Sequence, residues 1–184
     1  MRRLTHSTPR GVRLTVTALV VLTALAAALG AAGLRWQHSA SLPRGLYRLH
    51  GDAPIRRGSI VLWCLDAARG QWAHRRGYLA RGDCPGAVEP LGKVVLGVAG
   101  DTIDWTPEGL RVRGHFVART DPVRSDGAGR PLTPIPFGRY VLGRDALWLY
   151  SPYTRRSLDS RYVGAVPRTW VRAVVTPIMT RVVP

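Results

Sequence analysis

The chain contains a single lysine, which is its first candidate for chemistry. Lys93 stands among 27 basic residues, the rest of which are arginine, and it lies in the apolar run LGKVVLGVAGD. Arginine keeps its proton under the conditions a folded protein meets, so it cannot act as a base. A lysine removed from water can lose its charge, because burial disfavours the ammonium form. Lys93 is therefore a candidate general base, although codon bias toward arginine also accounts for the composition.

Ser41 is a candidate nucleophile that such a base could serve. It lies in the run SASLPRGLY, residues 39–47, where Pro43 and Gly45 are expected to fix an irregular backbone around the serine. Taken alone, Ser-x-Pro-x-Gly is an ordinary turn in which the serine hydroxyl bonds the backbone. The motif indicates a catalytic serine only if a general base lies beside it.

A third polar segment, SLDSRYVG, occupies residues 157–164. Asp159 and Arg161 are spaced to form an ion pair that fixes a loop, which leaves Ser157 free to bond a neighbour. A strand end held by a salt bridge would explain this segment equally well.

Together these three segments resemble the type I signal peptidases, and within that superfamily the TraF-type peptidases of conjugative transfer systems, which mature pilin precursors. The resemblance rests on the Ser-Leu-Pro-x-Gly-Leu-Tyr box, the lysine box ending in Gly-Asp and the late Asp-Ser-Arg-Tyr-x-Gly box, and it spans about Leu14 to Pro177. Two positions depart from the family pattern. Val94 stands where arginine is frequent, which does not prevent Lys93 from acting as a base. Ala99 stands where proline is frequent, which affects turn rigidity.

The resemblance implies a serine endopeptidase with a Ser/Lys dyad. Ser41 is expected to attack the scissile carbonyl while neutral Lys93 accepts the hydroxyl proton. The oxyanion hole is expected to combine the Ser41 backbone N–H with the Ser39 hydroxyl. By the same resemblance, Ser157 orients the lysine.

The resemblance also assigns supporting roles and partners. Asp159 and Arg161 are expected to brace the site rather than react. The expected substrates are precursor proteins that carry signal or leader peptides. No cofactor is implied, and the five scattered histidines offer no metal-ligand spacing.

An uncharged run of 21 residues, Leu14 to Leu34, predicts a single N-terminal transmembrane helix. Residues 1–13 carry four arginines and no acid, so this basic stretch is expected in the cytoplasm, and residues 35–184 are expected to form an exported domain. A cleaved signal peptide is the competing interpretation, because small residues follow at 26–32. Both interpretations export the rest of the chain. The uncleaved anchor, which we favour, places the enzyme in the inner membrane with its catalytic domain facing the periplasm.

The net charge of +16 suits anionic lipid headgroups or nucleic acid. The arginines are scattered and no nucleic-acid-binding signature is present, so the expected partner is the lipid bilayer and no nucleic acid is expected. Export also changes the meaning of Cys64 and Cys84, because two cysteines in an oxidising compartment are usually paired. We predict a structural disulfide between them.

The exported part predicts a mainly β, signal-peptidase-like domain. Short apolar runs are bounded by Gly, Pro or Asp, which is typical of strands. Residues 106–109 predict a hairpin turn, Ala67 to Arg81 predicts a short helix, and Thr120–Pro136 predicts a surface loop. The expected strands are Gly45–Leu49, Ser59–Leu65, Gly92–Val98, Thr102–Trp105, Leu110–Val112, Ala146–Tyr150 and Trp170–Thr176.

Two other functions remain open at this stage. A housekeeping signal peptidase shares the dyad, but such enzymes more often show a Ser-Met-x-Pro-Thr arrangement, which this chain lacks. A non-catalytic, basic, membrane-anchored component of a secretion apparatus predicts no special role for Lys93. A Lys93→Arg substitution distinguishes the peptidase from that component.

Overall fold

The computed structural model describes residues 10–182, and its internal contacts divide the chain into two units at Arg35 and Trp36. The first unit contains helix α1, Arg10–Ala31. The basic stretch predicted over residues 1–13 lies mostly outside the described residues. Within residues 10–182, no helix is long and apolar enough to cross a membrane. The transmembrane span predicted over residues 14–34 is therefore not confirmed.

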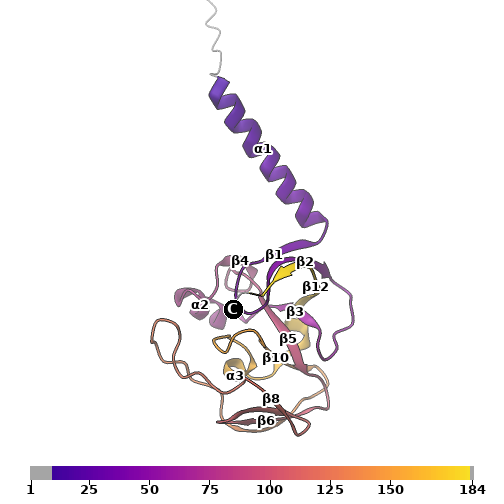
Figure 1. The fold of residues 1–184 in the computed structure, drawn as a ribbon, viewed down its shortest axis with the longest axis vertical. Coiled ribbons are helices and arrows are strands. Elements are labelled where there is room, and N and C mark those ends of the chain that lie inside the picture. Colours follow the sequence, from indigo (N-terminus) through magenta and orange to yellow (C-terminus); the bar gives the residue numbers. More distant parts are fainter. Residues whose placement is uncertain (1–9, 183–184) are drawn as a thin grey trace, which may run out of the picture. The chain divides into compact units, whose positions relative to one another are not determined.

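The second unit is built on a seven-stranded sheet, and Figure 1 shows its strands crossing the middle of this unit. Where strand pairing is resolved within this sheet, neighbours run antiparallel. In sheet order the strands are β1 (Leu34–Gln37), β2 (Arg44–His50), β12 (Val171–Arg181), β3 (Ile60–Trp63), β5 (Leu91–Gly97), β10 (Ala146–Tyr150) and β11 (Val166–Pro167).

A smaller, four-stranded antiparallel sheet follows β5 in the chain. Its order is β8 (His115–Val117), β7 (Gly109–Val112), β6 (Thr102–Thr106) and β9 (Gly138–Val141). Thr106 pairs with Gly109 across the turn between β6 and β7, which confirms the predicted hairpin.

The segment between β3 and β5 carries helix α2, Ala67–Arg75, and the short strand β4, Arg81–Cys84. Asp66 caps the helix by accepting a hydrogen bond from the Arg69 N–H. The helix ends earlier than the predicted Arg81, because Gly77 adopts a left-handed conformation with φ of +71° just beyond it. The predicted Cys64–Cys84 disulfide is present and ties this segment to the end of β3.

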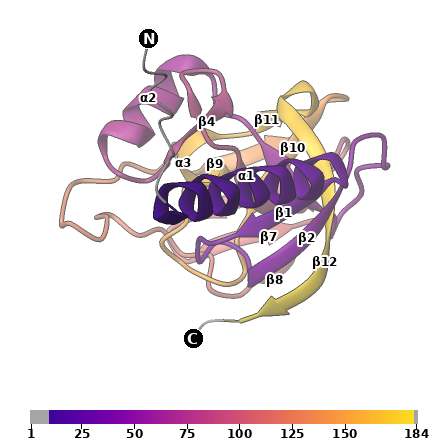
Figure 2. The same cartoon turned by 90° about the horizontal axis from the view of Figure 1, so that it is seen from above.

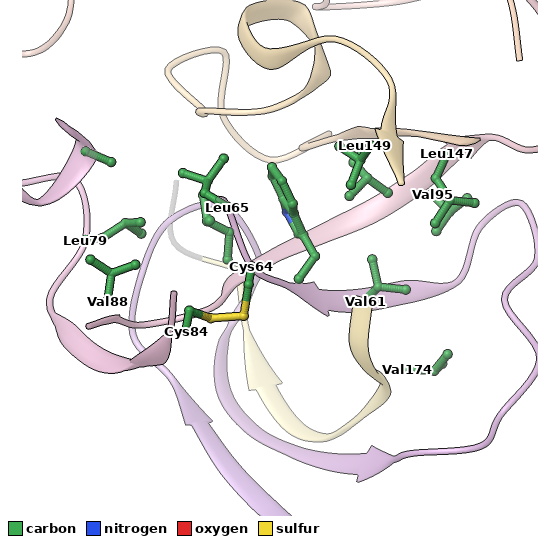
Figure 3. Packing of buried hydrophobic residues seen from close by; sticks show 14 residues of the cluster. Val61, Cys64, Leu65, Leu79, Cys84, Val88, Val95, Leu147, Leu149 and Val174 are labelled. Carbon is green, nitrogen blue, oxygen red and sulfur yellow. A yellow bond between two sulfur atoms is a disulfide. The ribbon is translucent and has the colours of Figure 1, made fainter. Parts of the chain in front are cut away.

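Two hydrophobic clusters lie on opposite faces of β5 and β10. Residues alternate between the two faces of a strand. Val95, Leu147 and Leu149 accordingly join the larger cluster drawn in Figure 3, which also contains the disulfide. Leu96 and Trp148 point the other way and pack against the small sheet. The central strand β5 is therefore enclosed on both sides, which determines the environment of Lys93.

The mainly β class is confirmed, and each of the seven predicted strands is present; Ala146–Tyr150 agrees at both ends, and the other six differ at one or both ends by one to a few residues. The largest difference is in β12, which continues past the predicted Thr176 to Arg181. The predicted loop over Thr120–Pro136 contains only an isolated bridge between Ser125 and Pro131. The remaining elements are helix α3 (Ser160–Val163) and the 3-10 turn Arg168–Trp170, viewed from a second direction in Figure 2.

Candidate active site

A cleft of about 320 Å³ collects the residues that the sequence singled out for chemistry. Ser39, Ser41, Lys93 and Ser157 all line it, although they come from three distant parts of the chain. Its other walls are formed by the disulfide-tied segment and by the loop before β9. The fold thus brings the predicted nucleophile, base and orienting serine into one cavity.

Two glycines allow these segments to approach each other closely. A Cβ at Gly92 would lie 2.5 Å from Leu42 Cδ1, so only glycine lets the residue after Ser41 pack beside the residue before Lys93. A Cβ at Gly45 would lie 2.1 Å from the Met179 carbonyl oxygen, so β12 can pair with β2 only when position 45 is glycine. Both contacts explain why glycine is needed in these boxes.

The Lys93 side chain is 1% exposed and projects from β5 on the same face as Leu91 and Val95. Its Nζ donates a hydrogen bond to the Gly92 carbonyl oxygen at 3.0 Å. Burial lowers the pKa of Lys93 from 10.5 to about 8, an effect that the Asp159 charge opposes and the Arg161 charge reinforces. Lys93 is therefore neutral at only mildly alkaline pH, as a general base requires.

The candidate nucleophile is held by neighbours on two sides. The Ser41 Oγ lies 3.4 Å from the Ser157 Oγ, and the Ser41 carbonyl oxygen accepts a 2.8 Å hydrogen bond from the Ser151 hydroxyl. The Tyr47 hydroxyl donates to the Pro43 carbonyl oxygen at 2.9 Å, which closes the turn after the serine. Within residues 10–182, no hydrogen bond joins Lys93 Nζ to either serine hydroxyl. The direct hydrogen bond expected between Lys93 and Ser41 is therefore not formed in this structure.

The Asp159–Arg161 pair lies behind the cleft, and neither side chain is exposed to solvent. Arg161 donates to both carboxylate oxygens, from Nε at 2.9 Å and from Nη2 at 2.8 Å. Its Nη2 also donates to the Arg155 carbonyl oxygen at 3.1 Å, and Asp159 caps helix α3. The predicted ion pair is thus formed, and it fixes the loop that carries Ser157.

Gln37 and Ser151 also contribute to the site and were not identified from the sequence. The Gln37 amide Nε2 donates to the Ser39 hydroxyl oxygen at 2.7 Å, so the Ser39 proton remains available to a second acceptor. Gln37 is 8% and Ser151 2% exposed. Neither stands in a motif with recognisable spacing, because Gln37 belongs to the unpredicted strand β1 and Ser151 follows directly on β10.

The cleft lining combines serine hydroxyls with the amine of Lys93. Within residues 10–182, no three His, Cys, Asp or Glu side chains come together in a metal-binding group. No cofactor is required for the chemistry that a buried lysine and a serine can perform.

Comparison with known proteins places these features in context. The family described as "Signal peptidase, peptidase S26" matches residues 9–179. Plasmid transfer protein TraF of Escherichia coli is 34% identical over 171 residues, covering 90% of this chain and 93% of that protein. Conjugal transfer protein TraF of Agrobacterium tumefaciens is 34% identical over 165 residues, covering 89% and 92%. A crystal structure of a signal peptidase I from Enterococcus faecalis aligns with 69% of this chain and all of its own, at 16% identity and a TM-score of 0.39.

Proposed function

Because the chain belongs to the S26 signal peptidase family, we propose that it is a serine endopeptidase that removes leader peptides from exported precursors. One observation carries this proposal. The only lysine of the chain lies buried in the wall of the cleft that also presents Ser41. A basic scaffold protein has no use for a lysine in that position, whereas a Ser/Lys peptidase depends on it.

The proposed reaction uses Ser41 as nucleophile and Lys93 as general base. In the structure the Lys93 amine donates a hydrogen bond to the Gly92 carbonyl oxygen. In the reaction, the lone pair of neutral Lys93 accepts the proton of the Ser41 hydroxyl as the Ser41 oxygen attacks the scissile carbonyl. The protonated lysine then gives the proton to the leaving amine, which leaves an acyl-enzyme. Water activated by the same lysine releases the acyl group and restores the free serine.

The charge that develops on the substrate carbonyl needs donors nearby. We assign this role to the Ser41 backbone N–H and to the Ser39 hydroxyl, which Gln37 orients from the opposite side. Loss of one such donor typically lowers the rate by about 10²–10³. We assign to Ser157 the role of orienting Lys93, and the 3.4 Å distance between its Oγ and the Ser41 Oγ supports this.

The substrates we propose are pilin-type precursors of a conjugative transfer system. The support is the similarity to TraF proteins, which are named for plasmid and conjugal transfer. A periplasm-facing, membrane-associated location follows from the same family and stays a prediction. It rests on the uncharged run Leu14–Leu34 and the basic residues before it, and carbonate extraction of cell membranes tests it.

Incubating the purified chain with pilin precursors from its own genetic neighbourhood tests the proposed function. Wild type should shorten one precursor at a single bond, while Ser41→Ala and Lys93→Arg should leave it intact. Ser59→Ala is the matched control, because Ser59 lies outside the cleft and its hydroxyl accepts a local hydrogen bond from the Arg56 N–H. Processing that persists in both dyad variants would refute the mechanism, and a silent Lys93→Arg would favour the scaffold.

A further inference from the structure

A second groove, of about 490 Å³, lies beside the catalytic cleft and has no part in the proposed dyad chemistry. Its lining is largely apolar, from helix α2, helix α3 and the loop that precedes β9. The residues that give it this character are Leu65, Ala68, Trp72, Leu132, Leu158 and Val163. The volume of the groove lies within the range of about 300–1,000 Å³ typical of ligand sites.

Both arginines of the groove lining already have partners within the protein, and the remaining lining is mostly apolar. Arg76 stacks over the Trp72 ring at 4.7 Å and donates to the Pro131 carbonyl oxygen at 2.8 Å. Arg69 pairs with the Asp66 carboxylate at 3.1 Å. An occupant is therefore expected to present apolar side chains.

The wall between the groove and the cleft is a hairpin loop, residues 123–133, which we call the strap. Figure 1 shows it as the orange-pink loop below α2. At its tip, Asp126 accepts hydrogen bonds from the Tyr78 hydroxyl at 2.5 Å and from Arg130 Nε at 2.6 Å. At its base, the Tyr162 hydroxyl bonds both the N–H and the carbonyl oxygen of Val123, each at 2.9 Å. Because the strap is hydrogen-bonded at both its tip and its base, the groove has its shape before any ligand binds.

The groove adjoins the cleft. Leu132, on the strap, and Leu158 line both cavities. Leu158 directly follows Ser157, whose hydroxyl lies 3.4 Å from that of Ser41. The groove thus begins one residue away from the proposed reaction centre.

The cleft alone cannot hold a long stretch of a protein substrate. At about 320 Å³ it lies at the lower end of the range for small-molecule sites. A precursor chain bound across Ser41 must therefore continue over neighbouring surface, and the groove is the adjoining apolar surface with a preformed shape.

We propose that this groove is an exosite that binds an apolar segment of the precursor lying outside the cleaved bond. This inference rests on the proposed function, because the position of the groove next to the cleft, with Leu132 and Leu158 lining both, identifies the precursor as the occupant. The exosite would let the enzyme select its precursor by a segment that the cleft does not contact. Losing one leucine-sized contact there corresponds to on the order of a tenfold loss in affinity.

Binding measurements on a catalytically inert background test the exosite independently of cleavage. The full-length chain with Ser41→Ala is titrated calorimetrically with the pilin-type precursor and with a ten-residue peptide centred on its leader junction. Ala68→Trp is added to fill the groove. Gln71→Trp is the matched control, because Gln71 is exposed on the same helix and lies outside the groove lining.

The exosite predicts that Ala68→Trp raises the Kd for the full precursor about tenfold relative to Gln71→Trp, while both variants bind the short peptide equally. Ala68→Arg, which keeps the helix and introduces a charge, should give the same loss. Equal precursor affinity in all three variants would overturn the exosite, as would a parallel loss for the short peptide. Failure of the wild type to cleave the precursor would instead count against the proposed function and leave this binding result standing.

Discussion

Replacing Lys93 with methionine should stabilise the fold at neutral pH while abolishing cleavage. Methionine has a similar length and carries no charge. In the wild type, burial lowers the pKa of Lys93 from 10.5 to about 8, so at pH 7 the fold carries a charge in a site that disfavours it. The difference between these two pKa values corresponds to about 3 kcal/mol of unfolding free energy. Replacing buried charges by apolar groups of similar volume is often stabilising by a comparable amount.

The sign of the pH dependence follows from which state binds the proton. Between about pH 8 and 10.5, unfolded Lys93 is still protonated, whereas folded Lys93 has lost its proton. The unfolded state therefore binds more protons in this window, and wild-type stability rises with pH through it. The advantage of Lys93→Met should accordingly shrink from about 3 kcal/mol at pH 7 to below about 1 kcal/mol at pH 10.5.

Urea unfolding of the full-length chain, followed by tryptophan fluorescence at several pH values, measures this difference. Comparing wild type with Lys93→Met cancels the contribution of every other titrating group. Lys93→Arg is the matched control, because arginine stays charged throughout and should gain nothing as the pH rises. The kcat/KM of the wild type should rise about tenfold from pH 7 to pH 9 in parallel, as the neutral fraction of a group with pKa near 8 increases.

A stability difference that stays constant from pH 7 to pH 10.5 would refute the reasoning. It would mean that Lys93 titrates at the same pKa in the folded and unfolded chain, and burial would then not prepare it as a base. A stability difference near zero at pH 7 would lead to the same conclusion. Loss of cleavage alone would not rescue the argument, because many changes in a cleft abolish activity.

Three further predictions concern residues around the dyad. Ser151→Ala should lower kcat about tenfold with little change in KM, because it removes the hydrogen bond that holds the backbone carbonyl of Ser41 in place. Steady-state kinetics with a precursor peptide measure both constants, and a change confined to KM would contradict this prediction. Gln37→Leu should lower kcat less than Ser39→Ala, which removes an oxyanion donor outright, and the same kinetics applied to both variants rank them. Replacing Cys64 and Cys84 by serine should lower the unfolding free energy by about 3 kcal/mol, since the bridge closes a loop with a sequence separation of 20, and urea denaturation checks it.

Much of the fold could be predicted from the sequence because most strands of this domain are short, apolar and bounded by turn residues. Strand β12 shows where such reasoning fails. Pro177 ends the predicted strand because proline cannot donate to a sheet. In the structure the strand continues to Arg181, because the register shifts between Pro177 and Met179 and absorbs the missing donor. Sequence pattern alone does not show that β2 provides a partner strand long enough to support this.

The candidate site also contains residues that the sequence identifies and residues that it does not. Lys93 and Ser41 could be proposed because few residue types can act as base and nucleophile, and Ser157 was added because its segment completes the resemblance to the type I signal peptidases. Gln37 and Ser151 could not, because their role depends on an amide and a hydroxyl that reach a backbone or side-chain oxygen from another segment. Those contacts exist only once the chain has folded, and many other polar residues could have made them.

The two members of the buried Asp159–Arg161 pair shift the pKa of Lys93 in opposite directions. A lone carboxylate near Lys93 would hold the lysine protonated, since the Asp159 charge raises its pKa. Arg161 neutralises that carboxylate through two hydrogen bonds, and its own charge lowers the pKa of Lys93. The pair can therefore fix the loop that carries Ser157 without cancelling the effect of burial on the lysine. A neutral brace, such as two apolar side chains, could also fix the loop, and it would spare Lys93 the net upward effect of the pair, because the Asp159 charge shifts the pKa of Lys93 more than the Arg161 charge does.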